Sequence, residues 1–584
     1  MRPAHRMVVA GLLLIAATSV TVQYLSRSPL PTQHSSTEEA QPPSLSLPDK
    51  PSIVVLPFVN MSDDRGQEYF SDGITEDITA DLSKISGFFV IARNSAFTYK
   101  GKAVKVQEVS REMGVRYVLE GSVRKAGEQV RVTTQLIDGP SGGHVWSERY
   151  DRPLTDIFAV QDEIVQQLVT TLRVEVLEAE QERVRRIPTN NLTAYDSLLR
   201  AKEYFYGVTK EGTTRARQLC EQAIALDPQY ALAYAYLSGA YWQDWLWNPD
   251  PQNPERALAL AQQAVALDDT LPEAHTYLGL AYQRKTSYEL AIAELERAIT
   301  LEPNYAEGYA ALAGVMSWVG RPAETIVWIE KAMRLNPRYP GWYASHLGVA
   351  YRLTGRYAEA IAAQKQSLLR NPSSEYAYGE LVSSYVQQWA SQLSQDPQTV
   401  EQAMAAAQRM VALADSSSVA HGALGSVYLY QQQYAQALAE IERAVALNPN
   451  IAGYYAALAE VLSRVGRADE ALRAAEQALR LKPWIADRHL YPTGVAYALV
   501  GRDAEALAPL QQFLTRSPDI LGAHLTLAAV YSELGKEAEA RTEAAEVLRL
   551  NPQFSLEVHR KRAPIKDLAV LERQLAALRE AGLK

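Results

Sequence analysis

The side chains that could do chemistry in this chain fall into three small groups. Paired carboxylates serve general acid–base catalysis, histidine clusters bind transition metals, and an activated cysteine is a nucleophile. The sequence offers one example of each: the carboxylates Asp72, Glu76 and Asp77, the histidines His275, His421 and His524, and the single cysteine Cys220. Whether any of them forms a site depends on the elements that position them.

The carboxylates lie near the start of a segment with helical periodicity. Between Glu68 and Ile85 the apolar residues recur at three- and four-residue spacing, which predicts a helix. Ser71 or Asp72 would cap this helix, and the early acids would complement its dipole. We favour this structural interpretation over a catalytic one.

The other two groups give no support to catalysis or to a metal site. The three histidines stand at one position of an internal repeat and so do not converge on a metal, and Cys220 is expected on the apolar face of a helix, as a core residue. The sequence contains no phosphate-binding loop of the form G-x-x-x-x-G-K-S/T, no H-E-x-x-H and no G-x-S-x-G. We therefore expect a protein that is not an enzyme and uses no cofactor.

Length and composition indicate an acidic protein of several domains. The chain has 584 residues, and 47% of them are hydrophobic. This length is too great for one compact core. Lys and Arg number 58 against 67 Asp and Glu, a net charge of −9, which argues against nucleic acid as the main partner. One cysteine excludes an intramolecular disulfide framework.

The N-terminus has the pattern of an export signal. Arg2, His5 and Arg6 precede an apolar run from Met7 to about Val22, so residues 1–25 are expected to form a signal anchor that spans the inner membrane once. Basic residues before the run place the bulk of the chain in the periplasm. Cleavage after Ser19, with secretion to the periplasm, is the alternative. Residues 26–50 are rich in Pro, Ser and Thr and are expected to be a disordered linker.

A small α/β domain is expected over residues 51–155. The run from Ser52 to Phe58 is rich in β-branched residues and predicts a buried strand. A helix, a second strand over Phe88–Ala92 and a second helix come next, and alternating segments around Lys125-Ala-Gly-Glu predict a hairpin. With a last strand and a long helix over residues 156–184, the order is βαβαβββα. Residues 156–189 would connect this domain to the second half of the chain.

Several motifs of this domain, in order, resemble the amino-terminal-like domain of TolB. They are Ser52-Ile-Val-Val-Leu-Pro-Phe, Glu68-Tyr-Phe-Ser-Asp-Gly-Ile-Thr-Glu-Asp-Ile, Val90-Ile-Ala-Arg-Asn-Ser, Gly114-Val-Arg-Tyr-Val-Leu-Glu-Gly-Ser-Val-Arg and Leu154-Thr-Asp-Ile-Phe-Ala-Val-Gln-Asp-Glu. In bacterial proteins of this family the domain is joined to tetratricopeptide repeats, often behind a class III nucleotide cyclase or a winged-helix regulator. Only about six residues precede the apolar run here, so neither of those domains is expected.

The second half of the chain is an array of one repeat. Its units are expected to close at Pro228, Asp269, Pro303, Pro337, Pro372, Asp415, Pro449, Pro483, Pro518 and Pro552. Most of these markers are 34 or 35 residues apart, the period of tetratricopeptide repeats, in which each unit is a pair of antiparallel helices. The fold class is thus mainly α. About ten repeats over residues 190–552 would form a superhelix, and residues 553–584 would form capping helices.

Resemblance to this repeat family also implies where a partner binds. Such superhelices bind proteins or peptides in the concave groove along their first helices, where aromatic and arginine side chains dominate interface energies. The family arrangement places five residues of that kind in the groove: Trp242, Arg284, Trp318, Arg352 and Arg464. Packing between repeats is the competing role for each of them. No lysine occupies a groove position that can be assigned.

The leading hypothesis is a membrane-anchored, non-catalytic scaffold that gathers protein partners in the bacterial cell envelope. The resemblances also suggest two alternatives. The chain would be a regulatory component of a nucleotide-cyclase or transcription-regulator system, or an assembly factor for envelope machinery.

Overall fold

The computed structural model describes residues 47–584 except 245–249, 251 and 482–486. The expected membrane segment over residues 1–25 and nearly all of the expected linker over residues 26–50 lie outside the described residues. Within the described ranges, no helix combines the length and apolar character needed to cross a bilayer.

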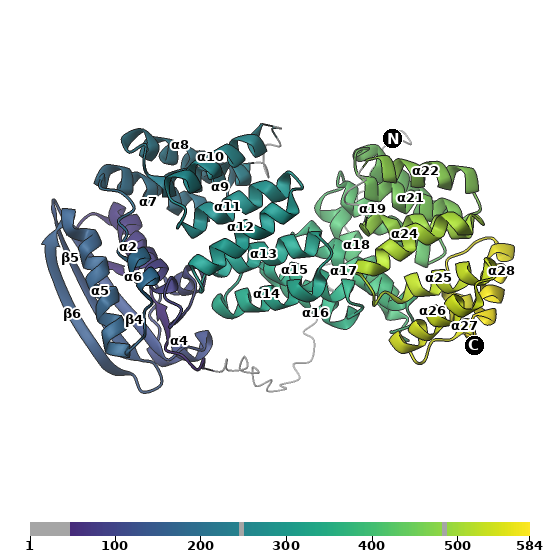
Figure 1. Ribbon diagram of the computed structural model, residues 1–584, viewed down its shortest axis with the longest axis horizontal. Coiled ribbons are helices and arrows are strands. Elements are labelled where there is room, and N and C mark those ends of the chain that lie inside the picture. The colour runs from purple at the N-terminus through teal and green to yellow at the C-terminus, as the bar shows by residue number, and fades with distance from the viewer. Residues whose placement is uncertain (1–46, 245–249, 251, 482–486) are drawn as a thin grey trace, which may run out of the picture. The chain divides into compact units, whose positions relative to one another are not determined.

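An α/β unit opens the described chain and is built on one mixed sheet (Figure 1). Its strands are β1 (Ser52–Val55), β2 (Val59–Asn60), β3 (Phe89–Val90), β4 (Tyr117–Ala126), β5 (Gln129–Asp138) and β6 (Gly143–Pro153). The order is β3-β1-β4-β5-β6, and β2 pairs with β4. Strand β1 runs parallel to β3 and β4, whereas β4, β5 and β6 form an antiparallel meander. The predicted hairpin is confirmed, since Val123 lies opposite Val132 across β4 and β5.

Two helices cover one face of this sheet. Helix α2 (Glu68–Ser83) and helix α5 (Ile157–Leu172) share a buried core with Ile53, Leu119 and Val132 of the strands. Helix α4 (Val106–Met113) ends at Gly114 in the left-handed conformation, and it packs with Val54 and Val118 against the other face. The short elements between these are η1 (Arg65–Gln67), α3 (Arg93–Ala96), η2 (Phe97–Tyr99) and η3 (Leu154–Asp156).

The expected helix over residues 156–184 is wrong, because the structure has two helices there. Helix α5 ends where Arg173 takes the left-handed conformation with φ 52°, and α6 (Glu178–Val184) comes after it. Helix α5 belongs to the core under the sheet, so the α/β unit extends past residue 155 and the segment 156–189 is more than a connector.

The rest of the chain is helical and forms ten antiparallel pairs in the described residues (Figure 1). The first helices are α7 (Leu192–Tyr206), α9 (Ala231–Asp244), α11 (Pro272–Arg284), α13 (Ala306–Trp318), α15 (Gly341–Leu353), α17 (Glu375–Ala390), α19 (Ser418–Tyr430), α21 (Ala452–Arg464), α23 (Asp487–Leu499) and α25 (Leu521–Glu533). The second helices are α8 (Lys210–Leu226), α10 (Asn253–Leu267), α12 (Tyr288–Leu301), α14 (Pro322–Leu335), α16 (Tyr357–Arg370), α18 (Gln398–Leu413), α20 (Tyr434–Leu447), α22 (Ala468–Leu481), α24 (Asp503–Arg516) and α26 (Glu537–Leu550). Each second helix ends two residues before its sequence marker.

Close helix packing results from the small residues of the repeat. A Cβ atom at Gly279 of α11 would lie 2.7 Å from Leu295 and 3.0 Å from the backbone oxygen of Ala291, both in α12. Gly320 and four equivalent glycines take the left-handed conformation in the turn between paired helices. Where the repeat lacks this glycine, Thr286 and Gln432 take the same conformation against the preference of their side chains.

Two further helices, α27 (Leu556–Arg562) and α28 (Leu568–Glu580), come after the last pair. Leu571, Leu575 and Leu578 of α28 are buried against α25, as expected for a capping helix, whereas Leu568 is exposed. The array also folds back on itself, because Gly355, in the turn between α15 and α16, lies close to Asp519, just after α24.

Candidate interaction surface

Helix α2 of the α/β unit lies across the first helices of the leading pairs. Tyr69 donates a hydrogen bond to Asp196 of α7 at 2.5 Å. Gly73 packs so closely on α7 that a Cβ atom there would lie 2.6 Å from the Leu199 side chain. The α/β unit thus covers part of the surface that the first helices present, which is the surface expected to bind partners.

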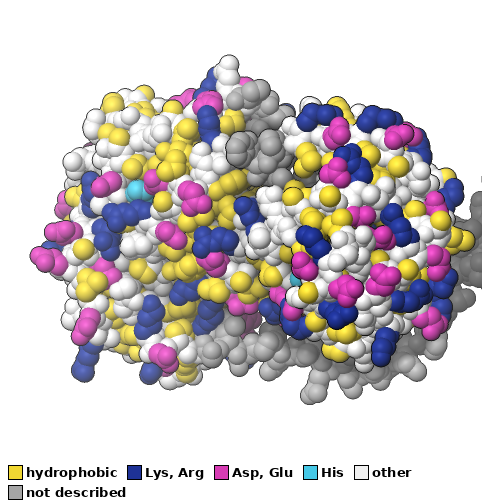
Figure 2. All heavy atoms as spheres, turned by 45° about the vertical axis from the view of Figure 1, so that its right-hand side comes forward, with side chains coloured by type: hydrophobic (Ala, Val, Ile, Leu, Met, Phe, Trp, Pro, Cys, Tyr) yellow, Lys and Arg dark blue, Asp and Glu magenta, His cyan; other side chains and the backbone are white. Residues whose placement is uncertain are grey.

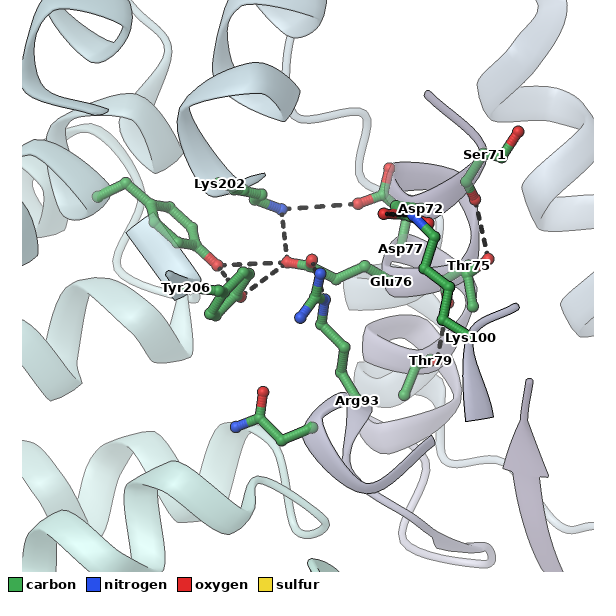
Figure 3. A network of polar contacts seen from close by, with 12 residues as sticks. Ser71, Asp72, Thr75, Glu76, Asp77, Thr79, Arg93, Lys100, Lys202 and Tyr206 are labelled. Carbon is green, nitrogen blue, oxygen red and sulfur yellow. Dashed lines mark hydrogen bonds and ion pairs between the residues drawn. The ribbon is translucent and has the colours of Figure 1, made fainter. Parts of the chain in front are cut away.

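Buried charges hold this contact together (Figure 3). The Glu76 carboxylate of α2 lies 2.8 Å from Arg93 of α3 and 3.1 Å from Lys202 of α7. It also accepts hydrogen bonds from Tyr206 of α7, at 2.9 Å, and from Tyr236 of α9. The Arg93 guanidinium lies over the Tyr206 ring at 4.1 Å. The network therefore joins two elements of the α/β unit to two pairs of the array.

The pKa values show that Glu76 stays ionised in this buried setting. Burial alone raises the pKa of a carboxyl, but Lys202 and Arg93 outweigh it and hold the pKa of Glu76 below its usual value. Burial alone would lower the pKa of Lys202, but the charges of Glu76 and Asp77 outweigh burial, so the pKa of Lys202 is raised. At Asp77 burial prevails over Lys202 and raises the pKa. The site is a charge clamp, with Glu76 as its anion.

The contact continues along the array past α14 to the start of α15. Asn94 donates a hydrogen bond to Glu307 of α13 at 2.9 Å, and Ser95 donates one to Asn336, after α14, at 2.6 Å. Arg334 of α14 donates to the backbone oxygen of Gly114 at 2.9 Å. No sequence pattern indicated a role for these residues, because their partners lie more than 200 positions away along the chain.

The capping role expected for Ser71 or Asp72 is wrong. Helix α2 begins at Glu68, so Ser71 and Asp72 lie inside it and do not cap it, and Asp72 pairs with Lys100 at 2.6 Å. The acids serve tertiary contacts more than the helix dipole. Lys202, to which no groove position was assigned from the sequence, is buried on the face of α7 that α2 covers.

The C-terminal segment covers first helices in the later pairs. Ser555 and the Gln392 side chain exchange two hydrogen bonds, at 2.9 and 3.0 Å. Arg562 of α27 donates to the backbone oxygen of Trp389 at 3.0 Å, and its guanidinium lies 3.6 Å from the Trp389 ring centre. The backbone N–H of Lys566 donates a hydrogen bond to the backbone oxygen of Arg464 in α21 at 2.8 Å. The long turn after α17 therefore anchors this C-terminal segment.

The five residues predicted for the groove divide into two groups. Arg352 and Arg464 are 9% and 7% exposed, and each forms an internal ion pair, with Glu380 at 2.9 Å and with Glu460 at 2.7 Å. Both side chains therefore make contacts within the array.

The other three predicted residues lie near the C-terminal ends of three consecutive first helices: Arg284 and Trp318 are the last residues of α11 and α13, and Trp242 comes two residues before the end of α9. Trp318 is 41% exposed, and Arg284 is also exposed. The Arg284 guanidinium lies 5.5 Å from the ring centre of Trp242, which is half-buried in α9. We call these three residues the Trp–Arg–Trp row.

Family models for the tetratricopeptide repeat match residues 252–306, 344–374 and 418–451. The helical pairs in these segments match tetratricopeptide repeats. A curated relative is similar in part: the protein named putative adenylate cyclase 3 of Rhizobium meliloti (strain 1021) is 53% identical over 199 residues. That match covers 34% of this chain, and the chain spans about a third, 34%, of the length of that relative.

Solved structures align with parts of the chain. TTC0263, a thermophilic TPR protein of Thermus thermophilus, is 23% identical over 32% of this chain and 98% of its own, with a TM-score of 0.29. The human IFIT1 dimer with m7Gppp-AAAA is 15% identical over 68% of this chain and 88% of its own, with a TM-score of 0.39.

Three of the tetratricopeptide repeats carry a histidine clamp. His275 lies with Nδ1 2.6 Å from Glu294 and Nε2 2.9 Å from the backbone oxygen of Asp269. His421 and His524 make the same two contacts. At His275 and His524 both partners are acceptors when the glutamate is ionised, so both ring nitrogens donate in the imidazolium form. The partner glutamate comes 19 residues after each histidine, a spacing that the sequence already contains.

We expect these clamps to make stability fall as the pH rises. Burial lowers the pKa of His275 and His524, but the hydrogen bonds to Glu294 and Glu543 outweigh it and raise both values above the ordinary 6.5. Their contribution is therefore complete below pH 6.5 and is lost as the pH rises through the folded-state pKa. His275→Leu should cost about 1.5–3 kcal/mol at pH 6 and less at pH 9.

Urea unfolding of the wild type and His275→Leu at both pH values measures this. A cost that is the same at pH 6 and pH 9 would contradict the imidazolium assignment.

Proposed function

We propose that this protein is a non-catalytic scaffold for protein partners and that a partner docks on the Trp–Arg–Trp row. The observation that carries the proposal is the division of the predicted groove residues. Arg352 and Arg464 are buried in ion pairs, whereas Trp318 is 41% exposed and Arg284 lies near Trp242 on neighbouring repeats. Tryptophan and arginine are the residues that most often dominate interface energies.

The charge distribution favours such a local contact. On the face shown in Figure 2, Lys and Arg side chains are interspersed with Asp and Glu, and hydrophobic side chains lie between them. A mixed surface of this kind gives little long-range steering to a partner of one sign. Aromatic and arginine contacts would then provide most of the affinity.

The sequence supports a location for the scaffold in the cell envelope. The basic residues and apolar run at the N-terminus favour a single-pass anchor in the inner membrane, with the repeats in the periplasm. The ordered motifs between Ser52 and Glu163 favour a TolB-like α/β unit. Alkaline phosphatase fused after Lys584 should be active in whole cells, and an inactive but fully produced fusion would place the repeats in the cytoplasm.

Capture of partners tests the scaffold. The tagged full chain, solubilised in detergent, is expected to retain specific proteins from membranes of its source, identified by mass spectrometry. Trp318→Ala and Arg284→Ala should each weaken capture about tenfold or more, the loss typical of an interface hot spot. Leu369→Ala, at a leucine that is largely exposed on α16, is the matched control. Capture that is equal in all four proteins excludes the row as the docking surface.

A second candidate function rests on the curated relative. Identity of 53% over 199 residues with a protein named putative adenylate cyclase 3 supports a regulatory role in a nucleotide-cyclase system. In that case a cyclase should be among the captured proteins, and its rate of cyclic-nucleotide formation should change when the chain is added. A captured set without a cyclase favours the general scaffold.

A further inference from the structure

A pocket lies where the α/β unit meets the fifth and sixth repeats. It encloses about 680 Å³, and its lining includes Thr98 of η2, Arg338 and Tyr339 before α15, Trp342 of α15, Arg370 of α16 and Tyr376 of α17. This volume is in the range of small-molecule sites, roughly 300–1,000 Å³. None of these residues belongs to the Trp–Arg–Trp row or to the Glu76 clamp.

Two exposed aromatic rings form one wall of the pocket. Trp342 and Tyr376 are each the second residue of a first helix, one repeat apart, and they are 44% and 42% exposed. The His346 ring centre lies 5.7 Å from that of Trp342 and 6.4 Å from that of Tyr376. Large aromatic rings usually bury most of their surface. This wall therefore offers flat apolar area to a planar ligand.

The charged lining of the pocket is positive. The Arg370 guanidinium lies 4.2 Å from the Tyr339 ring centre and is exposed, and among the described residues no carboxylate forms an ion pair with it. Arg338 is held by Glu112 at 2.6 Å, outside the lining. The remaining polar lining consists of hydroxyls and the Asn371 amide, with no acidic side chain among the described residues that line it. Arg370 is thus an anion-binding group beside an aromatic wall.

We propose that this pocket binds a small organic anion that carries a planar ring. The ring packs on Trp342 and Tyr376, and the carboxylate or phosphate binds Arg370. An aromatic carboxylate and a nucleoside monophosphate share this chemistry, and both fit the volume. A site of this kind goes beyond the scaffold function, because it adds a small-molecule ligand at the contact between the α/β unit and the repeats.

Isothermal titration of the full chain in detergent tests the proposal with four probes. Adenosine 5′-monophosphate and indole-3-acetate carry both a ring and an anion, whereas adenosine lacks the anion and inorganic phosphate lacks the ring. At least one of the first two should bind with a Kd below about 1 mM and at least tenfold tighter than either partial probe. The tighter of the two identifies the source as phosphate or carboxylate.

Variants then place the ligand. Trp342→Ala and Arg370→Gln should each weaken binding about tenfold or more, Arg370→Lys should weaken it less than Arg370→Gln, and Leu369→Ala, next to Arg370 but outside the lining, should leave it unchanged. Thermal unfolding of each variant verifies that it is folded. The proposal is overturned if neither complete probe binds below about 1 mM, if a partial probe binds as tightly, or if the folded Trp342 and Arg370 variants bind like the wild type.

Discussion

Replacing Glu76 by glutamine should destabilise the contact between the α/β unit and the repeats by about 3–5 kcal/mol. The change keeps the shape of the side chain and removes the charge that Arg93 and Lys202 share. Both cations would then remain buried without their main counterion, and leaving a buried charge uncompensated costs far more than losing an exposed pair. Asp77, 3.8 Å from Lys202, offsets part of the loss.

Hydrogen exchange of the backbone amides of α2 and α7 measures this cost. Protection there should fall about 100-fold or more, since 1.4 kcal/mol corresponds to a factor of ten. Glu324→Gln is the matched control, because Glu324 pairs with Arg321 at 2.5 Å on the exposed surface of α14 and such pairs contribute about 0–1 kcal/mol. Equal protection in Glu76→Gln and Glu324→Gln would show that the clamp does not hold the contact.

The helical array could be predicted from the sequence because its signal is repeated. Each unit has the same spacing of small residues, turn glycines and closing prolines. Where the helix boundaries of one unit are ambiguous, the neighbouring units therefore indicate them. The end of α5 at Arg173, inside the expected long helix, could not be predicted in this way because the segment is not repeated. Its sequence lacks the glycine or proline that usually marks a helix end, and the neighbours Leu172 and Val174 pack against the core of the α/β unit.

The candidate site was less predictable, because single contacts between distant segments decide it. Glu76 and Lys202 are 126 positions apart, and no periodic pattern connects them. Arg284, Arg352 and Arg464 stand at equivalent repeat positions, so the repeat pattern predicts the same role in the groove for all three. The structure separates them through what covers each one: Arg464 lies beside the C-terminal segment, whose position the repeat pattern does not encode.

Replacing Arg464 by alanine should therefore act on folding rather than on partner binding. Arg464 donates two hydrogen bonds to Glu460, and burial lowers its pKa less than Glu460 raises it, so the guanidinium stays charged. The alanine variant leaves Glu460 without its counterion and opens a cavity beside Tyr430, at a cost of about 3–5 kcal/mol. Arg284→Ala, at the equivalent exposed position, should cost less than about 1 kcal/mol.

Urea unfolding of the two variants gives the comparison, and the His559 ring provides a local reporter. Burial, with a contribution from the Arg464 charge, lowers the pKa of His559 to about 4. Without Arg464 the ring loses a neighbouring cation, so its pKa, followed by NMR, should rise. An Arg464→Ala variant with an unchanged urea midpoint and an unchanged His559 pKa would make Arg464 a candidate for partner binding in the groove again. A lowered midpoint together with a raised pKa would assign Arg464 to the packing of α27 on the repeats.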